Sequence, residues 1–380
     1  MKTYVFTNRV YPPVGGATGE LLKELAEGLV AEGARVVVVT SKQHEADSGG
    51  LVNGVEVTRV GTATFTRASH WRRAWSYLTL YPQLMWQVWK LGRVDAVVSM
   101  TDPPMQVAAV TLASCQAKKK IHWAQDVYPE LAEELGVIPR GGWFARGLRA
   151  VSTWALRRQD KIVVVGRCMR KRLICRGIDA TKIEVIPNWS PVDAVGREAV
   201  DAMRQKLGWD GKFIALYSGN IGLAHDFETL VGAAKLLRGT GATVVFAGEG
   251  PRLEDVRRAT SGLDHVLFLP PQPRSDLAAF LAAADVHIVT VRAGLEGLVV
   301  PSKAYGVLAS QRPMIYVGAA DAEVAKLVAE SKAGKIFANG DAAGVASALG
   351  QWVAGQSEPR VARSEFGLGK ALEKWREVLG

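Results

Sequence analysis

The sequence predicts two doubly wound α/β domains, and three observations lead to this fold class. Its 380 residues exceed what one hydrophobic core usually fills. Short β-branched runs alternate with helical patterns along the chain, which is typical of parallel sheets covered by helices. Several of these runs are apolar throughout, as expected of strands that are buried on both faces.

The expected strands form two groups with the same rhythm. The first half holds runs at residues 3–8, 35–40, 94–100, 119–124 and 161–165. The second half holds runs at residues 213–219, 242–248, 266–270, 286–291 and 313–318. Residues 189–211 lack a strand pattern and are rich in turn formers, so we place the linker there. Because ligands of open parallel sheets bind beyond the carboxyl ends of the strands, we expect the domains to face each other across a ligand-binding cleft.

The formal net charge of +10 is concentrated in the first half of the chain. Residues 1–190 carry 26 basic against 16 acidic side chains, whereas residues 191–380 carry 21 of each. This asymmetry indicates an anionic partner, which is a membrane surface, a phosphorylated lipid or nucleic acid. Solubility charge without a single partner is the alternative.

Cysteine usage and hydropathy point to the cytoplasm. Cys115, Cys168 and Cys175 show no Cys-x-x-Cys spacing, which argues against a disulfide framework or a zinc site. The N-terminus lacks the apolar core of a signal peptide, and no run of about 20 uncharged apolar residues could span a bilayer. We therefore expect a cytoplasmic protein, soluble or peripheral on a membrane.

Glycine-bearing turns follow three of the expected strands. These turns hold Gly15, Gly16 and Gly19, then Gly219, Asn220, Gly222 and His225, and finally Gly248, Glu249 and Gly250. Backbone N–H groups in such a turn, with the positive end of the next helix, approach an anion closely. The first turn lacks the dinucleotide fingerprint, and a purely structural turn is an equal alternative there. For His225 the alternative is a solvated or capping side chain.

Pro301 and Ser302 are typical helix-start residues, which places Lys303 in the first turn of a helix. A cation there is disfavoured by about 0.3–1 kcal/mol against the helix dipole. A bound diphosphate would reverse that sign, because it pairs with the ammonium and accepts the free N–H groups. The alternative is a lysine that extends to solvent.

Residues 70–93 combine tryptophans and tyrosines with arginines at both ends. Amphipathic aromatic side chains beside cations suit a membrane interface, so we place a membrane or acceptor face at Trp71, Arg72, Arg73 and Trp75. A helix that only covers the first sheet is the equal alternative. We expect Pro82 to bend or split this helix.

Six segments together resemble the retaining GT-B glycosyltransferases of family 4. They are "YPPVGGATGELLKELAEGLVAEGARVVVVTS", "HWAQDVYPE", "IEVIPNW", "YSGNIGLAHDFETLVGAA", "FAGEGP" and "GLEGLVVPSKAYGVLASQRP", and they span nearly the whole chain. The likeness is to the branch that transfers N-acetylfucosamine-type aminosugars in bacterial O-antigen or capsule assembly. It implies an N-terminal acceptor-binding Rossmann-like domain at 1–190 and a nucleotide-sugar domain at 191–365. It also implies that a last helix, 366–380, packs back on the first domain.

The resemblance implies transfer, with retention, from a nucleotide diphosphate sugar, such as a UDP-linked N-acetylated aminosugar, to a polyprenyl-diphosphate-linked sugar. The enzyme would be peripheral on the inner face of the cell membrane, whose anionic surface it would contact, and would need neither nucleic acid nor a cofactor. No Asp-x-Asp occurs, so we expect no metal. The rivals are a sugar-nucleotide epimerase of the same fold and a non-catalytic membrane- or nucleic-acid-binding module.

The family's usual pair of glutamates is missing here, because their positions fall on Leu298 and Gly306. Only a loose role beside the donor sugar is carried over to Glu296. The ribose would then be held by a backbone group or by Glu249. The resemblance also implies that Asp126, or with less weight His122, contacts or activates the acceptor. Asp126 as the N-cap of the following helix is the alternative.

Overall fold

A computed structural model describes residues 1–13, 16–42, 49–61, 70–190, 194–356 and 366–380, apart from the side chains of residues 70–75. The chain folds into two compact units. Unit 1 comprises Met1–Asn188, Gly297–Val299 and Leu368–Gly380, and unit 2 comprises Trp189–Glu296 and Val300–Gly367. Residues 297–299, which we expected in the second domain, thus belong to unit 1.

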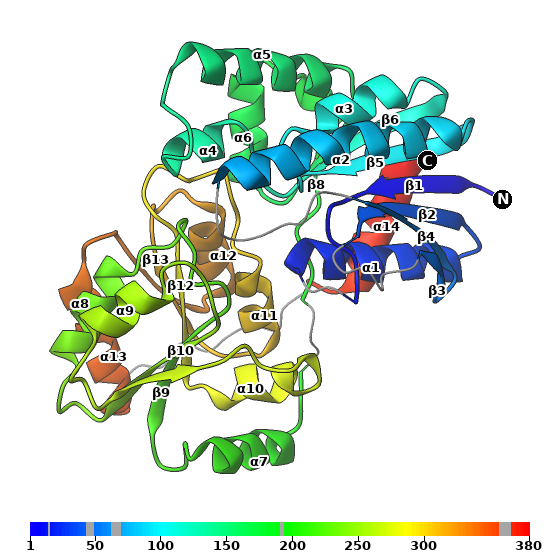
Figure 1. The fold of residues 1–380 in the computed structure, drawn as a ribbon. Coiled ribbons are helices and arrows are strands. Elements are labelled where there is room, and N and C mark those ends of the chain that lie inside the picture. Colours follow the sequence, from blue (N-terminus) through cyan, green and yellow to red (C-terminus); the bar gives the residue numbers. More distant parts are fainter. Residues whose placement is uncertain (14–15, 43–48, 62–69, 191–193, 357–365) are drawn as a thin grey trace. The chain divides into compact units, whose positions relative to one another are not determined.

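Unit 1 is built on an eight-stranded sheet in the order β3-β4-β2-β1-β5-β6-β7-β8 (Figure 1). Its strands are β1 (Thr3–Thr7), β2 (Arg35–Ser41), β3 (Gly50–Val52), β4 (Val55–Val60), β5 (Val94–Met100), β6 (Ala117–Ala124), β7 (Lys161–Val164) and β8 (Ile183–Val185). All neighbours pair in parallel except β3, which runs antiparallel to β4. The order reverses between β1 and β5, which is the switch point of a doubly wound sheet.

Helices cover both faces of this sheet. They are α1 (Ala17–Ala31), α2 (His70–Lys90), α3 (Gln106–Ala113), α4 (Glu130–Glu134), α5 (Trp143–Arg157), α6 (Arg167–Cys175) and α14 (Leu368–Leu379). Val5 and Val97 lie in one apolar cluster with Leu84 of α2 and Val110 of α3. Phe6 points to the opposite face, as alternate strand residues do, and its ring contacts Trp375 of α14.

Unit 2 repeats this plan on a six-stranded parallel sheet in the order β11-β10-β9-β12-β13-β14. Its strands are β9 (Phe213–Ser218), β10 (Ala242–Ala247), β11 (Val266–Leu269), β12 (Val286–Thr290), β13 (Met314–Val317) and β14 (Gly334–Phe337). Its helices are α7 (Arg197–Leu207), α8 (Glu228–Leu236), α9 (Leu253–Ala259), α10 (Leu277–Ala283), α11 (Lys303–Ala309), α12 (Glu323–Ser331) and α13 (Ala342–Val353). Tyr217 faces a core with α8 and α13, whereas Leu216 faces one with α7 and α10. The doubly wound α/β class is confirmed.

Two local expectations need correction. The proposed linker contains helix α7, which packs against α10 inside unit 2. Pro82 does not split α2, which runs unbroken from His70 to Lys90. The proline removes one backbone donor, and the side-chain amide of the next residue, Gln83, donates to the Thr79 carbonyl at 3.0 Å.

Candidate active site

In unit 2 the glycine turns after β9 and β10 are locked together at the carboxyl end of the sheet. The Gly219 amide donates to the Ala247 carbonyl at 2.9 Å, and the Ile221 amide donates to the Glu249 carbonyl at 2.8 Å. Gly248 has a φ of 146°, and a Cβ there would lie 2.0 Å from the Gly219 carbonyl oxygen. Only glycine fits so close an approach, so the sequence builds a rigid rim of two loops.

Lys303 points onto this rim and not to solvent, which rules out the extended alternative. Its ammonium lies 3.6 Å from the centre of the Tyr217 ring. The ammonium nitrogen is buried and has no hydrogen-bond partner among the described residues. Burial lowers the pKa of Lys303 well below its usual range. Because helix α11 has only seven residues, we assign anion binding to the Lys303 ammonium and not to the helix dipole. The side-chain amine of Lys303 is therefore placed to pair, as an ammonium, with a bound anion.

His225 stands beside this cation as a neutral imidazole. Its Nδ1 lies 2.6 Å from the Thr290 carbonyl oxygen, so Nδ1 carries the proton and donates it. Burial, and then the charge of Lys303, lowers the pKa of His225 to about 3. The neighbouring Asp226, and not His225, contacts the first turn of helix α8, where its carboxylate accepts the Thr229 amide at 3.1 Å.

The other predicted donor residues lie along the same unit. Asn220 is exposed, and its carbonyl accepts the Tyr217 hydroxyl at 2.7 Å. The Gly222 carbonyl accepts the His225 amide at 3.3 Å. Pro301 and Ser302 are half-buried just before α11.

The two acidic residues predicted in unit 2, Glu249 and Glu296, have different surroundings. The side chain of Glu249 is exposed beside the glycine rim. The Glu296 carboxylate accepts the Gly294 amide at 3.0 and 3.1 Å, so its own loop fixes it.

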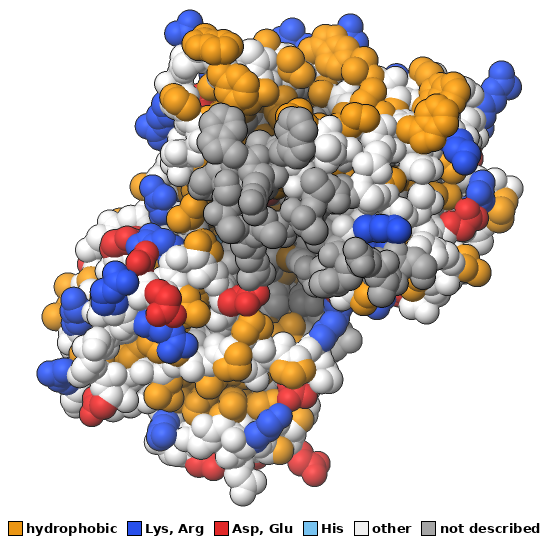
Figure 2. Space-filling view, in the orientation of Figure 1, with side chains coloured by type: hydrophobic (Ala, Val, Ile, Leu, Met, Phe, Trp, Pro, Cys, Tyr) orange, Lys and Arg blue, Asp and Glu red, His pale blue; other side chains and the backbone are white. Residues whose placement is uncertain are grey.

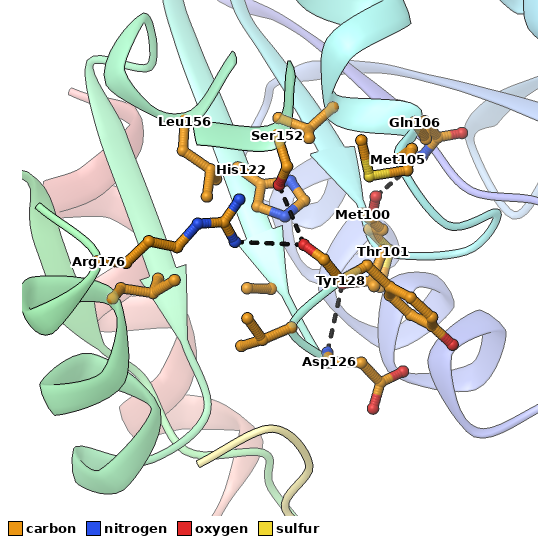
Figure 3. A pocket seen from close by; sticks show the side chains of 14 residues that line it. Met100, Thr101, Met105, Gln106, His122, Asp126, Tyr128, Ser152, Leu156 and Arg176 are labelled. Atoms are coloured by element: carbon orange, nitrogen blue, oxygen red, sulfur yellow. Dashed lines mark hydrogen bonds between the residues drawn. The ribbon is translucent and has the colours of Figure 1, made fainter. Parts of the chain in front are cut away.

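Unit 1 contains a separate small pocket at the carboxyl ends of β5 and β6 (Figure 3). It is lined by Met100, Thr101, Met105, Gln106, Val107, His122, Ala124, Asp126, Val127, Tyr128, Ser152, Leu156, Leu173 and Arg176. Two of the three predicted catalytic residues, His122 and Asp126, line it, but the Asp126 carboxylate points away from the His122 ring. They do not act as a hydrogen-bonded pair.

His122 is held inside the sheet. Its Nδ1 lies 2.9 Å from the Ser99 carbonyl oxygen and 3.1 Å from the Ser99 hydroxyl. Burial lowers the pKa of His122 to about 4, so the ring is neutral. These contacts favour a structural and orienting role.

Asp126 has the environment of a proton acceptor that works near neutral pH. Burial, and then the charge of Asp102, raises the pKa of Asp126 to about 7. Its backbone pairs with Val299 in an antiparallel bridge. Helix α4 begins at Glu130 with no side-chain cap, so the alternative role of Asp126 as its N-cap is wrong. A half-buried carboxylate with this pKa suits acid–base chemistry.

Some predicted residues lie outside this description. Gly15 and the side chains of Trp71, Arg72, Arg73 and Trp75 are outside the described residues, and Gly16 is exposed at the start of α1. Among the described side chains, no group of three metal-ligating residues is found. No helix in the described ranges is long and apolar enough to cross a membrane.

Sequence reasoning missed Tyr217, Thr290 and Arg176. Tyr217 lies within an apolar strand, where an aromatic side chain signals only a core position. Thr290 contributes a backbone carbonyl, which leaves no trace in the sequence. Arg176 lines the unit 1 pocket and donates to the Tyr128 carbonyl at 3.2 Å, but its sequence context is a run of surface cations.

Comparisons with known proteins decide the class of enzyme. Residues 16–189 match the family described as glycosyl transferase 4-like domain, and residues 212–354 match glycosyl transferases group 1. The chain is a GT-B glycosyltransferase. This glycosyltransferase is 28% identical over 336 residues to WcaI of Escherichia coli K12, a colanic acid biosynthesis glycosyl transferase, with 81% of each chain covered. It is also 28% identical over 248 residues to the glycosyltransferase WbjE of Pseudomonas aeruginosa, a match that spans 64% of this chain and 62% of WbjE.

Solved structures agree on the fold of the glycosyltransferase. Sucrose-phosphate synthase from Thermosynechococcus elongatus superposes with a TM-score of 0.75 at 15% identity, covering 100% of this chain and 98% of that one. Anabaena HepE, crystallised with UDP, superposes with a TM-score of 0.70 at 13% identity and covers 100% and 99% of the two chains. At such identities the likeness shows the GT-B fold alone.

Proposed function

We propose that this glycosyltransferase moves an N-acetylated aminosugar from its UDP-linked donor to a polyprenyl-diphosphate-linked sugar, with retention. Unit 2 would bind the donor and unit 1 the acceptor. The enzyme would work on the inner face of the cell membrane, where its lipid acceptor lies. The name of WcaI assigns that protein to colanic acid biosynthesis. This supports a role for the present enzyme in building a bacterial surface polysaccharide.

The observation that carries the donor assignment is the buried ammonium of Lys303, for which the described part of the chain supplies no hydrogen-bond partner. Burial of an ammonium is unfavourable without an anion to pair with it, so a lysine amine held in this position suits an anionic ligand. The leaving diphosphate gains negative charge in the transition state, and a preorganised ammonium stabilises it without reorganisation. The neighbouring Gly219 turn lies close to the same side chain. A Cβ placed on Gly219 would be 3.3 Å from the Lys303 Cε and 3.5 Å from its Nζ. Structures of HepE with UDP and with UDP-glucose support a uridine donor.

In the reaction, the bond between the sugar C1 and the diphosphate oxygen breaks, and a bond from C1 to an acceptor hydroxyl oxygen forms. The hydroxyl proton leaves the acceptor. Asp126 is our candidate to contact that hydroxyl, because a carboxylate with a pKa of about 7 accepts a proton under physiological conditions. The neutral rings of His122 and His225 orient their surroundings through carbonyl contacts.

A panel assay tests this function. The protein is incubated with UDP-, GDP- and dTDP-sugars, with and without short polyprenyl-diphosphate sugars, and lipid-linked products are scored by mass. We expect a product with a UDP-aminosugar only when the lipid acceptor is present. Free epimerised sugar without lipid product would favour the epimerase instead, and binding without any turnover would favour a non-catalytic module.

A further inference from the structure

Exposed apolar side chains gather on one part of unit 1. Among the described residues, the large hydrophobic side chains exposed between β4 and β7 are Leu78, Trp86, Trp89, Leu112, Val137, Trp143, Phe144 and Val151. Unit 2 exposes only Leu223 and Leu236 in its described part. Figure 2 shows hydrophobic side chains along the upper edge of unit 1, over α5, α3 and α2, with Lys and Arg at the margin. These helices form one layer, because α2 packs on α3 and α3 on α5.

The exposed side of helix α5 carries large apolar side chains as well as arginines. Ala145, Ala155 and Leu156 are buried against the rest of unit 1. At its start, Trp143 is 86% and Phe144 50% exposed, and Val151 two turns later is 46% exposed. Their side chains face outward with no described element covering them. Large exposed patches of this kind mark an interaction surface.

A groove rich in arginine runs along the same helix. It is lined by Arg146, Arg149, Ala150, Thr153, Trp154, Arg157 and Arg158. Arg149 pairs with Glu130 at 3.2 Å, but in the described ranges Arg146, Arg157 and Arg158 face no carboxylate. Their guanidinium contacts are carbonyl oxygens and the Trp154 ring. The groove therefore offers uncompensated positive charge beside an apolar surface.

We propose that α5 docks on an anionic phospholipid surface, with Trp143 and Phe144 inserted at the acyl boundary and Arg146 and Arg157 at the lipid phosphates. Aromatic rings with a cationic flank are the combination that binds a helix to such an interface. A protein partner would need an acidic surface to match these arginines, whereas an anionic membrane supplies both phosphates and apolar depth. The inference rests on the proposed function, in which the acceptor is itself a membrane lipid.

Co-sedimentation of the full chain with vesicles tests the proposal. The vesicles are phosphatidylcholine alone or mixed with phosphatidylglycerol. We expect binding to the mixed vesicles that weakens about tenfold in Trp143→Ser/Phe144→Ser, because two inserted rings are lost. Removing two charges in Arg146→Gln/Arg157→Gln should weaken binding by about 25-fold, at about fivefold for each cation near the surface.

Matched controls lie in unit 2. Leu236→Ser and the pair Arg197→Gln/Arg258→Gln remove an exposed apolar side chain and two exposed arginines there, and should bind like wild type. Equal loss in these controls, or unchanged binding of the α5 variants, would overturn the proposal. So would a concentration-dependent dimer that the α5 variants abolish, since it would assign this face to a second copy of the chain.

A second readout separates the docking from the proposed function. Turnover with a short, water-soluble polyprenyl-diphosphate sugar should be unchanged in the α5 variants. Turnover without vesicle binding by the wild type would reject the docking and keep the function. Vesicle binding without turnover would reject the function and keep the docking.

Discussion

Asp126 is a residue whose burial opposes folding. Its pKa of about 7 lies above the value of about 3.9 expected in an unfolded chain. The folded state therefore binds more protons than the unfolded state between about pH 4 and pH 7. Stability attributable to this group is complete below that window and declines as the pH rises through it. A loss of this kind is tolerated where the carboxylate has a function.

Replacing Asp126 with Asn should remove this pH-dependent loss, because the amide resembles the protonated acid. We expect a melting temperature above wild type at pH 8 and close to it at pH 4, measured by thermal unfolding. The gain at pH 8 should correspond to a few kcal/mol at most, on the order set by about 1.4 kcal/mol per pKa unit. The exposed Asp210→Asn serves as the control. A variant equally stabilised at both pH values would contradict the assigned pKa.

At the scale of elements, the two loops of the unit 2 rim hold each other through backbone contacts. The Arg252 amide donates to the Ile221 carbonyl at 3.0 Å, which adds to the contacts made by Gly219 and Glu249. A Cβ at Gly250 would lie 2.3 Å from the Ile221 carbonyl oxygen, so this second glycine is also fixed by space. The rim is rigid because its loops cannot move independently.

Gly248→Ala should disrupt this rim. Its methyl group would meet the Gly219 carbonyl at 2.0 Å, and we expect a destabilisation of about 3 kcal/mol or more, from strain plus overpacking. Gly262→Ala is the matched control, since Gly262 has a φ of 79° but nothing within 4 Å of a Cβ. It should be destabilised by only about 1–2 kcal/mol. Equal effects in a urea unfolding titration would show that the contact between the loops is unimportant.

At the scale of the whole molecule, the chain leaves unit 1 after Asn188, returns to it at Gly297–Val299 and ends in it with α14. Trp375 of α14 is completely buried, with its ring 4.9 Å from that of Trp123 and 6.4 Å from that of Phe6. Arg376 of the same helix pairs with Glu32 at the end of α1. The C-terminal helix is thus part of the unit 1 core.

Trp375→Ala should destabilise unit 1 by about 3–5 kcal/mol, the usual loss for a large aromatic side chain removed from a core. Lys374→Ala on the exposed side of the same helix should leave the melting temperature near that of wild type. Thermal unfolding followed by near-ultraviolet circular dichroism reports the change. If Trp375→Ala melted like Lys374→Ala, α14 would not be anchored as described.

Strands that are buried on both faces could be predicted from the sequence, because burial forces a continuous apolar run such as Arg35–Ser41. Among the strands at the sheet edges, Val266–Leu269 was predicted from its apolar run, but others were not. The Gly50–Val52 strand is exposed throughout, and Gly334–Phe337 is half-buried, so neither carries a distinctive pattern. Their formation depends on an available neighbour, which is a property of the folded sheet.

The candidate site likewise has some features that the sequence predicts and others that it does not. The glycine turns were predictable, because a left-handed backbone conformation and close approach demand glycine. The burial of Lys303 was not, since it depends on a ring from β9 and a turn that lie far away in the sequence. The raised pKa of Asp126 likewise comes from burial and then from the charge of Asp102, which no local pattern encodes.

Calorimetric titration of UDP into wild type and Lys303→Met tests the central claim most directly. Because burial lowers the pKa of the free Lys303 ammonium, a diphosphate that pairs with it should raise that pKa and draw in a proton. In two buffers of different ionisation enthalpy, we predict proton uptake on binding by the wild type. The variant should bind at least about tenfold more weakly, as expected when one buried charge-assisted contact is lost, without that uptake and without a lower melting temperature. Equal UDP affinity and equal proton uptake in the two proteins would contradict the account.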